Sequence, residues 1–367
     1  MSSRVFVLGA GFSKAASEKV SATDRLPLLW ELRELVEAWL GTHGLPAPPF
    51  PADRFPGAGG PDVERWLSFL AQPPPWVSPA DTKRCQAAFI DLSNAIAEVI
   101  REQERRVIAV EPVDWLPKLV VKWNGGPAGC WEDDQGKLQP GASDETTTVI
   151  TFNYDTLPER AYMQTAPSVG HGLPSNGAAD LFVAPLAPLE ARGLDTMTSR
   201  GFARLQLLKL HGSIDWYYSG LEAGPEDIVY HNRIQRWWSE PDPVTLPEFG
   251  SIVADKVPFL VPPTAVKTMA YRNAVLRSQW ARAASALADA DELVLMGFSL
   301  PPTDSVVLDM IEMQFDRGRH IFVVDSNSDL PDKIENSLPG RQVHKCYSGI
   351  TDPIPQWLDN DGRCRCP

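Results

Sequence analysis

The sequence has few cysteines, and they do not form a pattern. Only five occur in 367 residues, and no C-x-x-C pair is present. Structural zinc sites and disulfide frameworks are built from repeated, closely spaced pairs, so the spacing predicts neither, and no metal site is expected. Cys364 and Cys366 form a C-x-C without further ligands, and residues 361–367 are expected to be a flexible tail.

Long apolar runs are also missing. The apolar run near the N-terminus is too short for a signal peptide, and no later segment approaches the roughly 18 residues that a spanning helix needs. The sequence therefore predicts no membrane association. By elimination, the cytoplasm is the expected location.

Positive charge is in the minority. Lys and Arg total 34 against 47 Asp and Glu, which gives a formal net charge of −13. An acidic surface repels phosphate backbones, so direct nucleic-acid binding is not expected. A local pocket for one dinucleotide is compatible with that total.

Short runs rich in Val, Ile, Leu and Phe indicate strands. They cover residues 5–8, 148–152, 205–210, 259–261, 293–296 and 321–324, with a weaker run at 342–346. Runs that are apolar at nearly every position are typical of a parallel sheet covered on both faces. The expected fold class is α/β, with a doubly wound, Rossmann-like parallel sheet.

Helical patterns over residues 28–40, 63–70 and 82–108 lie between the first and second strands. They predict a mostly helical insertion module, residues 25–144, in a catalytic core formed by residues 1–24 and 145–360. The module carries Trp30, Trp39, Trp66 and Trp115, which either form an interface or pack on the core. Further helices are expected at 273–288 and 305–315, the latter capped by Thr303 or Asp304.

Glycine, proline or polar residues follow nearly every predicted strand. The clusters are Gly9-Ala10-Gly11-Phe12-Ser13, Asn153-Tyr154-Asp155, His211-Gly212-Ser213, Pro262-Pro263-Thr264, Gly297-Phe298-Ser299 and Asp325-Ser326-Asn327. The carboxyl ends of parallel strands lie along one edge of a sheet, where open α/β folds bind ligands. These clusters are therefore expected to converge on one cleft.

The first cluster is a glycine turn that suits close approach of a pyrophosphate. By itself it also fits a tight strand–helix turn. The G-x-G-x-x-G pattern is incomplete, because Lys14 occupies the third glycine position. No strand ending in an acid follows about 20 residues later, as a dehydrogenase of this fold would need.

Asn153 and His211 are the candidates for catalysis. The Asn153 amide can hold a water or a ribose hydroxyl, and the His211 imidazole can accept a proton near neutral pH. Asp155 is a candidate for binding a carboxamide or, alternatively, for capping a following helix. A turn-forming Asn and a His bonded only to backbone are the structural alternatives.

Taken in order, these clusters resemble the sirtuin-like superfamily in its divergent bacterial branch. The residues that carry the resemblance are Gly9 to Ser13, Thr151 to Asp155, Leu210 to Ser213, Gly297 to Leu300 and Asp325 to Asn327, with further similarity in DVERWLSFL from Asp62 and SLPPTD from Ser299. The matching motifs span almost the whole chain.

The resemblance implies a role for each motif. Gly9, Ala10, Gly11, Phe12 and Ser13 would hold the pyrophosphate and adjoining ribose of NAD. Asn153 would position a water or the nicotinamide ribose, Asp155 would face the nicotinamide amide, and His211 would be the base. The remaining cofactor-binding residues would be Gly297, Ser299, Asp325 and Asn327.

Two departures from the family pattern argue against lysine deacylation. The four-cysteine zinc module is absent from the sequence, and Phe152 stands where deacylases usually have Gln. The resemblance therefore implies an NAD hydrolase that cleaves the nicotinamide–ribose bond in anti-phage defence, stopping growth by NAD depletion in an abortive infection. An unrestrained enzyme of this kind would drain its own cell, so restraint by assembly is expected, and the tryptophans of the helical module make a homo-oligomer the expected form. The resemblance implies a separately encoded ATPase or Argonaute-like sensor as the partner. A zinc-less deacylase or ADP-ribosyltransferase, and a non-catalytic NAD or ADP-ribose sensor, are the alternatives.

Overall fold

The fold is seen in a computed structural model. It describes residues 3–57, 60–124, 130–132, 138–140, 147–165, 181, 187–188, 205–220, 222–231, 255–265, 267, 270–301, 304–360 and 362–363.

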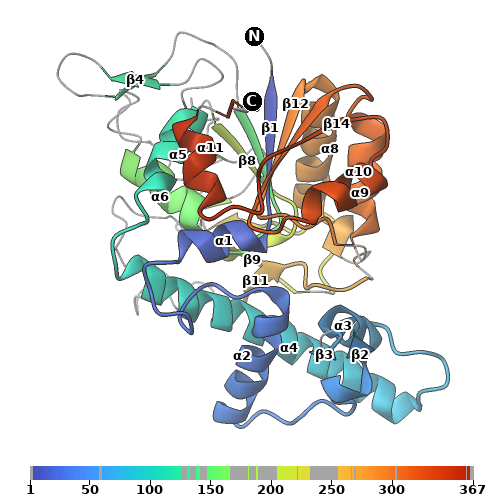
Figure 1. Ribbon diagram of the computed structural model, residues 1–367. Coiled ribbons are helices and arrows are strands. Elements are labelled where there is room, and N and C mark those ends of the chain that lie inside the picture. The colour runs from blue at the N-terminus through green and yellow to red at the C-terminus, as the bar shows by residue number, and fades with distance from the viewer. Residues whose placement is uncertain are drawn as a thin grey trace.

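A six-stranded parallel sheet forms the centre of the molecule (Figure 1). Its strands are β1 (Arg4–Leu8), β6 (Thr147–Thr151), β8 (Leu205–Lys209), β12 (Glu292–Met296), β13 (His320–Asp325) and β14 (Gln342–Ser348). They lie in the order β14-β13-β12-β1-β6-β8. The chain first builds outward on one side of β1 and later on the other, which is the strand order of a doubly wound dinucleotide-binding fold. The predicted fold class is confirmed.

Helices cover both faces of this sheet (Figure 1). Phe6 and Leu8 of β1 pack in one cluster with α5 (Trp115–Asn124), α6 (Leu157–Thr165) and α11 (Pro353–Asp359). Val5 and Val7, which alternate with them, pack in a second cluster with α8 (Ala274–Asp289), α9 (Ser305–Gln314) and α10 (Leu330–Ser337). Because both faces of the central strands β1, β12 and β13 are buried, these strands are apolar at nearly every position, and this is why the sequence reveals them. The edge strand β14 is largely polar and less buried, which is why its sequence signal is weaker.

The segment between β1 and β6 is mostly helical in its described part. It contains α1 (Ala10–Ala16), α2 (Leu29–Thr42), η1 (Ala52–Arg54), α3 (Val63–Ala71), α4 (Pro79–Ile108), α5 and two short hairpins, β2 (Pro56–Gly57) with β3 (Gly60–Pro61) and β4 (Cys130–Glu132) with β5 (Leu138–Pro140). One hydrophobic cluster runs from the sheet into α2, α3, α4 and α5 without interruption. The Phe6 and Trp123 rings, for example, lie 5.4 Å apart. The division of the chain into a core and an insertion module stays a prediction.

The four tryptophans of this segment differ in their surroundings. Trp66 and Trp115 are buried, at 2% and 7% exposure, and both belong to the cluster shared with the sheet. Trp39 packs against the same cluster, whereas Trp30 is 62% exposed. Packing, rather than an interface, therefore accounts for most of this aromatic surface.

The strand predicted at residues 259–261 belongs to a different sheet, which corrects its assignment to the parallel core. β11 (Val257–Leu260) pairs antiparallel with β9 (Gly212–Tyr218) in a second sheet that includes β10 (Tyr230–His231) and β7 (Ala187–Pro188). β9 itself was not predicted. It follows β8 after a tight turn in which Gly212 has a φ of +77°, and a Cβ there would lie 2.0 Å from the Phe259 carbonyl oxygen.

The sequence predicts neither a membrane-spanning helix nor a disulfide, and both expectations can be compared with the structure. Within the described ranges, no helix combines the length and apolar character needed to cross a membrane. Cys85 is free and buried in α4, but Cys346 on β14 is disulfide-bonded, an exception to the expectation that disulfides are absent.

Candidate active site

The candidate site lies between β1 and β12, where the order of the strands along the chain reverses. β1 and β12 are neighbours, but their following segments lead to opposite sides, and this leaves a crevice at their carboxyl ends. A cavity of about 760 Å³ opens there. Ten of the twelve predicted site residues line it, namely Gly9, Ala10, Gly11, Ser13, Asn153, Asp155, His211, Gly297, Ser299 and Asp325.

The other two predicted residues do not line the cavity. Phe12 is fully buried, and its ring packs 5.5 Å from that of Trp115. The Asn327 side chain is exposed and accepts a hydrogen bond from the Asp329 backbone N–H at 2.9 Å, just before α10. Phe12 therefore anchors α1 to the core, and Asn327 shapes a turn.

The glycine turns after β1 and β12 pack directly against each other. The Gly11 N–H donates to the Gly297 carbonyl at 3.0 Å. A Cβ on Gly9 would lie 2.5 Å from that carbonyl oxygen, and one on Gly11 would lie 3.0 Å from it. Gly297 has a φ of +57° and itself faces the backbone of α1. Close packing of the two turns is thus a first reason for these glycines, in addition to any approach of a phosphate.

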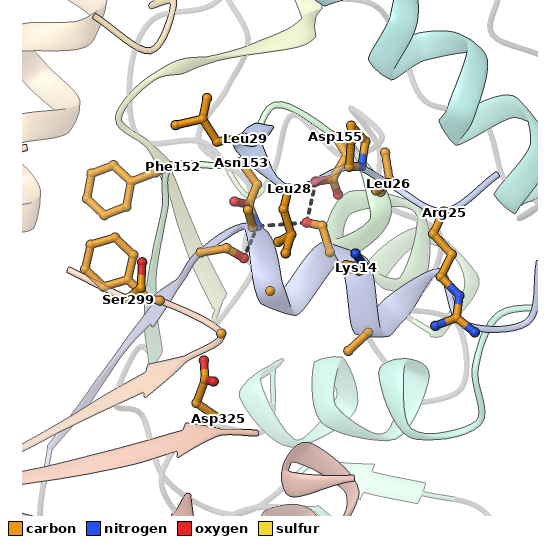
Figure 2. A pocket seen from close by; sticks show the side chains of 18 of the residues that line it. Lys14, Arg25, Leu26, Leu28, Leu29, Phe152, Asn153, Asp155, Ser299 and Asp325 are labelled. Carbon is orange, nitrogen blue, oxygen red and sulfur yellow. Dashed lines mark hydrogen bonds between the residues drawn. The ribbon is translucent and has the colours of Figure 1, made fainter. Parts of the chain in front are cut away.

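Asn153 ties the end of β6 to the first turn, as Figure 2 shows. Its Nδ2 donates to the Gly9 carbonyl and to Ser13 Oγ, each at 2.7 Å, and Ser13 Oγ donates to Asp155 Oδ2 at 2.5 Å. Because a carbonyl oxygen only accepts, the amide nitrogen must point toward Gly9. Asn153 Oδ1 makes no hydrogen bond to a described residue, so this acceptor is available to a ligand.

Both carboxylate oxygens of Asp155 are engaged. Oδ2 accepts from Ser13, and Oδ1 accepts from the backbone N–H of Leu157, the first residue of α6, at 3.2 Å. This is the helix-end role left open by the sequence. Burial raises the pKa of Asp155, which is 4% exposed.

A buried polar network supports the loop that carries Asn153 and Asp155. Lys209, at the end of β8, donates to the Asp155 carbonyl at 2.5 Å and to Glu159 Oε1 at 2.7 Å. Glu104 of α4 accepts from the backbone and hydroxyl of Thr156, each at 2.6 Å. Buried charges are tolerated only with such partners, so this network fixes the loop tightly.

His211 lies in the turn between β8 and β9 and is 5% exposed. The Phe152 ring meets the imidazole edge-on at 5.0 Å and stacks on Phe298 at 5.1 Å, so Phe152 forms an apolar wall rather than a polar contact. Burial, together with the Lys267 cation, lowers the pKa of His211 well below 6.5. The imidazole is therefore neutral at physiological pH and able to accept a proton.

Three cationic residues line the cavity, and two of them have carboxylate partners. Lys14 Nζ lies 2.5 Å from Glu31, and Lys267 forms an ion pair with Asp304. Arg25 has no carboxylate partner among the described residues; its Nη2 donates to the Glu18 carbonyl at 3.2 Å, and its buried Nε has no partner. Arg25 is thus the cavity cation available for an anionic ligand.

The remaining predicted contacts lie on the β12–β13 side. One carboxylate oxygen of Asp325 accepts from the Asn327 N–H at 2.9 Å, and burial raises the pKa of Asp325. The Ser299 side chain is exposed, and its carbonyl accepts from Lys333 at 2.7 Å. In the described residues, no group of three or more His, Cys, Asp or Glu could hold a metal ion.

Sequence reasoning missed Arg25, Lys267 and Tyr271. None of them directly follows a strand of the parallel sheet, so the strand-end pattern could not find them. The one sequence signal for Lys267 and Tyr271 was that they come shortly after the Pro262-Pro263 turn, and this signal is weak.

Comparisons with known proteins assign no family. No protein-family model and no curated protein matches the sequence. Among solved structures 19 chains match. One of them is described as "Structural Basis for the Mechanism and Regulation of Sir2 Enzymes". It is 13% identical to this chain, the alignment spans 98% of this chain and 91% of the matched chain, and the TM-score is 0.36. Neither this score nor this identity establishes a shared function.

Proposed function

We propose that this chain binds NAD as its substrate and hydrolyses the nicotinamide–ribose bond, giving nicotinamide and ADP-ribose. The observation that carries the proposal is the meeting of Asn153 and His211 in one cavity at the crevice of a doubly wound sheet. The cavity volume of about 760 Å³ lies within the range of roughly 300–1,000 Å³ that ligand pockets span. The sirtuin-like motifs of the sequence agree with this reading.

The proposed reaction breaks one C–N bond and forms one C–O bond. Nicotinamide leaves as a neutral base, and the ribose passes through an oxocarbenium-like state, as in glycoside hydrolysis. A water attacks the ribose carbon, its proton passes to His211, and that proton is then lost to solvent. Asn153 Oδ1 orients the ribose or the water.

The cavity charges suit such a substrate. The acidic side chains lining the cavity favour positive charge that develops on the ribose. Arg25, without a carboxylate partner in the described part of the chain, is assigned to the diphosphate. We propose that Asp155 acts near the nicotinamide by holding Ser13, which in turn accepts from Asn153, and that Asp325 contacts the adenosine side.

The biological role is proposed from the sequence resemblance. We propose that NAD depletion by this chain serves anti-phage defence by abortive infection. We also propose that it works as a homo-oligomer controlled by a separately encoded ATPase or Argonaute-like partner.

The test is incubation with NAD, with and without an acetylated peptide, followed by product chromatography. Free ADP-ribose is expected in both cases, whereas O-acetyl-ADP-ribose would indicate deacylation and unchanged NAD a sensing module. His211→Ala should lower the rate by about 10²–10⁴-fold with little change in melting temperature. A folded His211→Ala protein with wild-type turnover would exclude His211 as the base.

A further inference from the structure

The segment between β11 and α8 places a second set of groups against His211. The Tyr271 hydroxyl lies 3.4 Å from His211 Nε2, and the Tyr271 backbone N–H donates to the Lys267 carbonyl at 3.1 Å. The Tyr271 ring packs edge-on at 5.2 Å against Trp280, whose indole N–H donates to the Leu210 carbonyl at 3.3 Å. Tyr271 is therefore fixed relative to the backbone that carries His211.

Lys267 and Asp304 form an ion pair across the same cavity. Both residues are 8% exposed, and both line the cavity together with His211. Asp304 stands at the N-cap of α9, yet its carboxylate caps no N–H group of that helix. The Asp304 carboxylate thus pairs with Lys267 and does not cap the helix, which indicates a role for the ion pair at the cavity.

The groups around His211 come from several elements. Lys267 and Tyr271 approach from the segment between β11 and α8, where Tyr271 lies in the short helix η6 (Ala270–Arg272), and Asp304 approaches from the start of α9. Glu64 of α3 also lines the cavity, as do Tyr154 and Asp155 after β6. Tyr154 donates its hydroxyl proton to the Val261 carbonyl at 2.6 Å, so it does not compete for the imidazole. Among these groups, Tyr271 alone has a hydrogen-bond contact with the imidazole.

We propose that Tyr271 and the Lys267–Asp304 pair are positioning residues for His211. Tyr271 accepts a hydrogen bond from Nε2–H, so Nδ1, which has no described hydrogen-bond partner, keeps its lone pair for the proton of the attacking water. Burial and the Lys267 cation together keep the imidazole neutral between turnovers, and Asp304 holds Lys267 in place. After proton transfer the imidazolium keeps its Nε2–H bond to Tyr271, and the nearby cation promotes loss of the new proton to solvent.

The first experiment observes His211 without substrate, by NMR of the full-length protein with ¹⁵N-labelled histidine. The signals are assigned by comparison with His211→Gln. The wild type is expected to carry its proton on Nε2, and Tyr271→Phe should shift the population toward Nδ1–H. A wild-type protein with the proton on Nδ1 would overturn the proposal.

The same spectra measure the titration midpoint of His211. Lys267→Met removes a cation and should raise the midpoint, whereas Asp304→Asn leaves that cation without its partner and should lower the midpoint. Lys267→Arg, which keeps the charge, is the matched control. If Lys267→Met does not fold, the double variant Lys267→Met/Asp304→Asn carries the same expectation of a raised midpoint. Midpoints that move in one direction for both single variants, or do not move, would contradict the proposal.

The second experiment measures NAD turnover, and here the inference rests on the proposed hydrolase function. Tyr271→Phe should lower kcat about 10-fold, because one hydrogen bond contributes on that order, with KM for NAD unchanged. A change in KM with kcat intact would assign Tyr271 to binding and overturn positioning. If NAD is not cleaved at all, the proposed function fails, while the NMR measurements still decide the arrangement of His211.

Discussion

His211 combines burial with a nearby cation, and this combination sets when it can act as a base. Burial and Lys267 both favour the neutral imidazole, so its pKa lies well below 6.5. A general base must be unprotonated to accept a proton. A low pKa keeps the His211 imidazole unprotonated over a wider range of pH but makes it a weaker base. A strongly electrophilic ribose needs little basicity from the group that activates water.

The pH dependence of the reaction should follow from that shift. Activity is expected to be lost only as the pH falls through the lowered pKa of His211, so the acidic limb of kcat/KM should lie below pH 6.5. The same depressed pKa contributes stability that is present above the unfolded value and is lost as the pH falls through the folded value. A pH–rate profile with its acidic limb at or above 6.5 would contradict the assignment.

Arg25 should affect binding more than chemistry. Arg25→Ala removes the cavity cation that lacks a carboxylate partner in the described part of the chain, so KM for NAD should rise roughly 10-fold with little change in kcat. Arg33→Ala is the matched control, because Arg33 pairs with Glu37 on α2 and does not line the cavity. Equal effects of the two substitutions on KM would remove Arg25 from the diphosphate site.

At the scale of elements, the site depends on two glycine turns that touch. Gly9 is the N-cap of α1, and the turn after β12 packs against this helix start through Gly297. From sequence alone, Gly11 is expected to leave room for a pyrophosphate, with a bulkier side chain mainly obstructing binding. The contact between Gly11 and Gly297 shows that a Cβ would first meet protein backbone.

Substitution at Gly9 should therefore lower stability as well as binding. A Cβ there would lie 2.5 Å from the Gly297 carbonyl oxygen, and overpacking of this kind costs about 1–3 kcal/mol. Gly41→Ala on α2 is the control, since nothing lies within 4 Å of its Cβ and Ala stabilises a helix by about 0.5–1 kcal/mol relative to Gly. Urea unfolding measures both effects. A Gly9→Ala protein as stable as wild type would refute the packing role.

For the molecule as a whole, control of activity is the open prediction. An unrestrained NAD hydrolase would drain its own cell, so a weakly active resting state is expected, with restraint from assembly. Burial of Trp66 and Trp115 leaves Trp30, at 62% exposure, as the main exposed tryptophan of the four considered, and it lies at the cavity. An interface that involves the helical segment would therefore have to use other surface as well.

The test is the mass in solution and the NAD turnover of the protein alone and with the product of the neighbouring gene. An oligomer with low activity that rises in the mixture is expected. A fully active monomer that cells tolerate at high expression would rule out control by assembly and would make NAD depletion untenable as the function.

The sequence alone determined the parallel sheet and most of the site. Central strands buried on both faces are rich in apolar residues, and residues that end parallel strands share one edge, so Asn153, His211 and both glycine turns could be placed together from the sequence.

Only the tertiary structure decided how those residues are used. It placed β11 in a second sheet, directed the Asn153 amide nitrogen toward Gly9, gave Asp155 a role at the start of α6 and brought Lys267 and Tyr271 to His211. Such contacts join residues far apart in the chain. Their geometry depends on packing distances of a few ångströms, which periodicity and local spacing in a sequence do not encode.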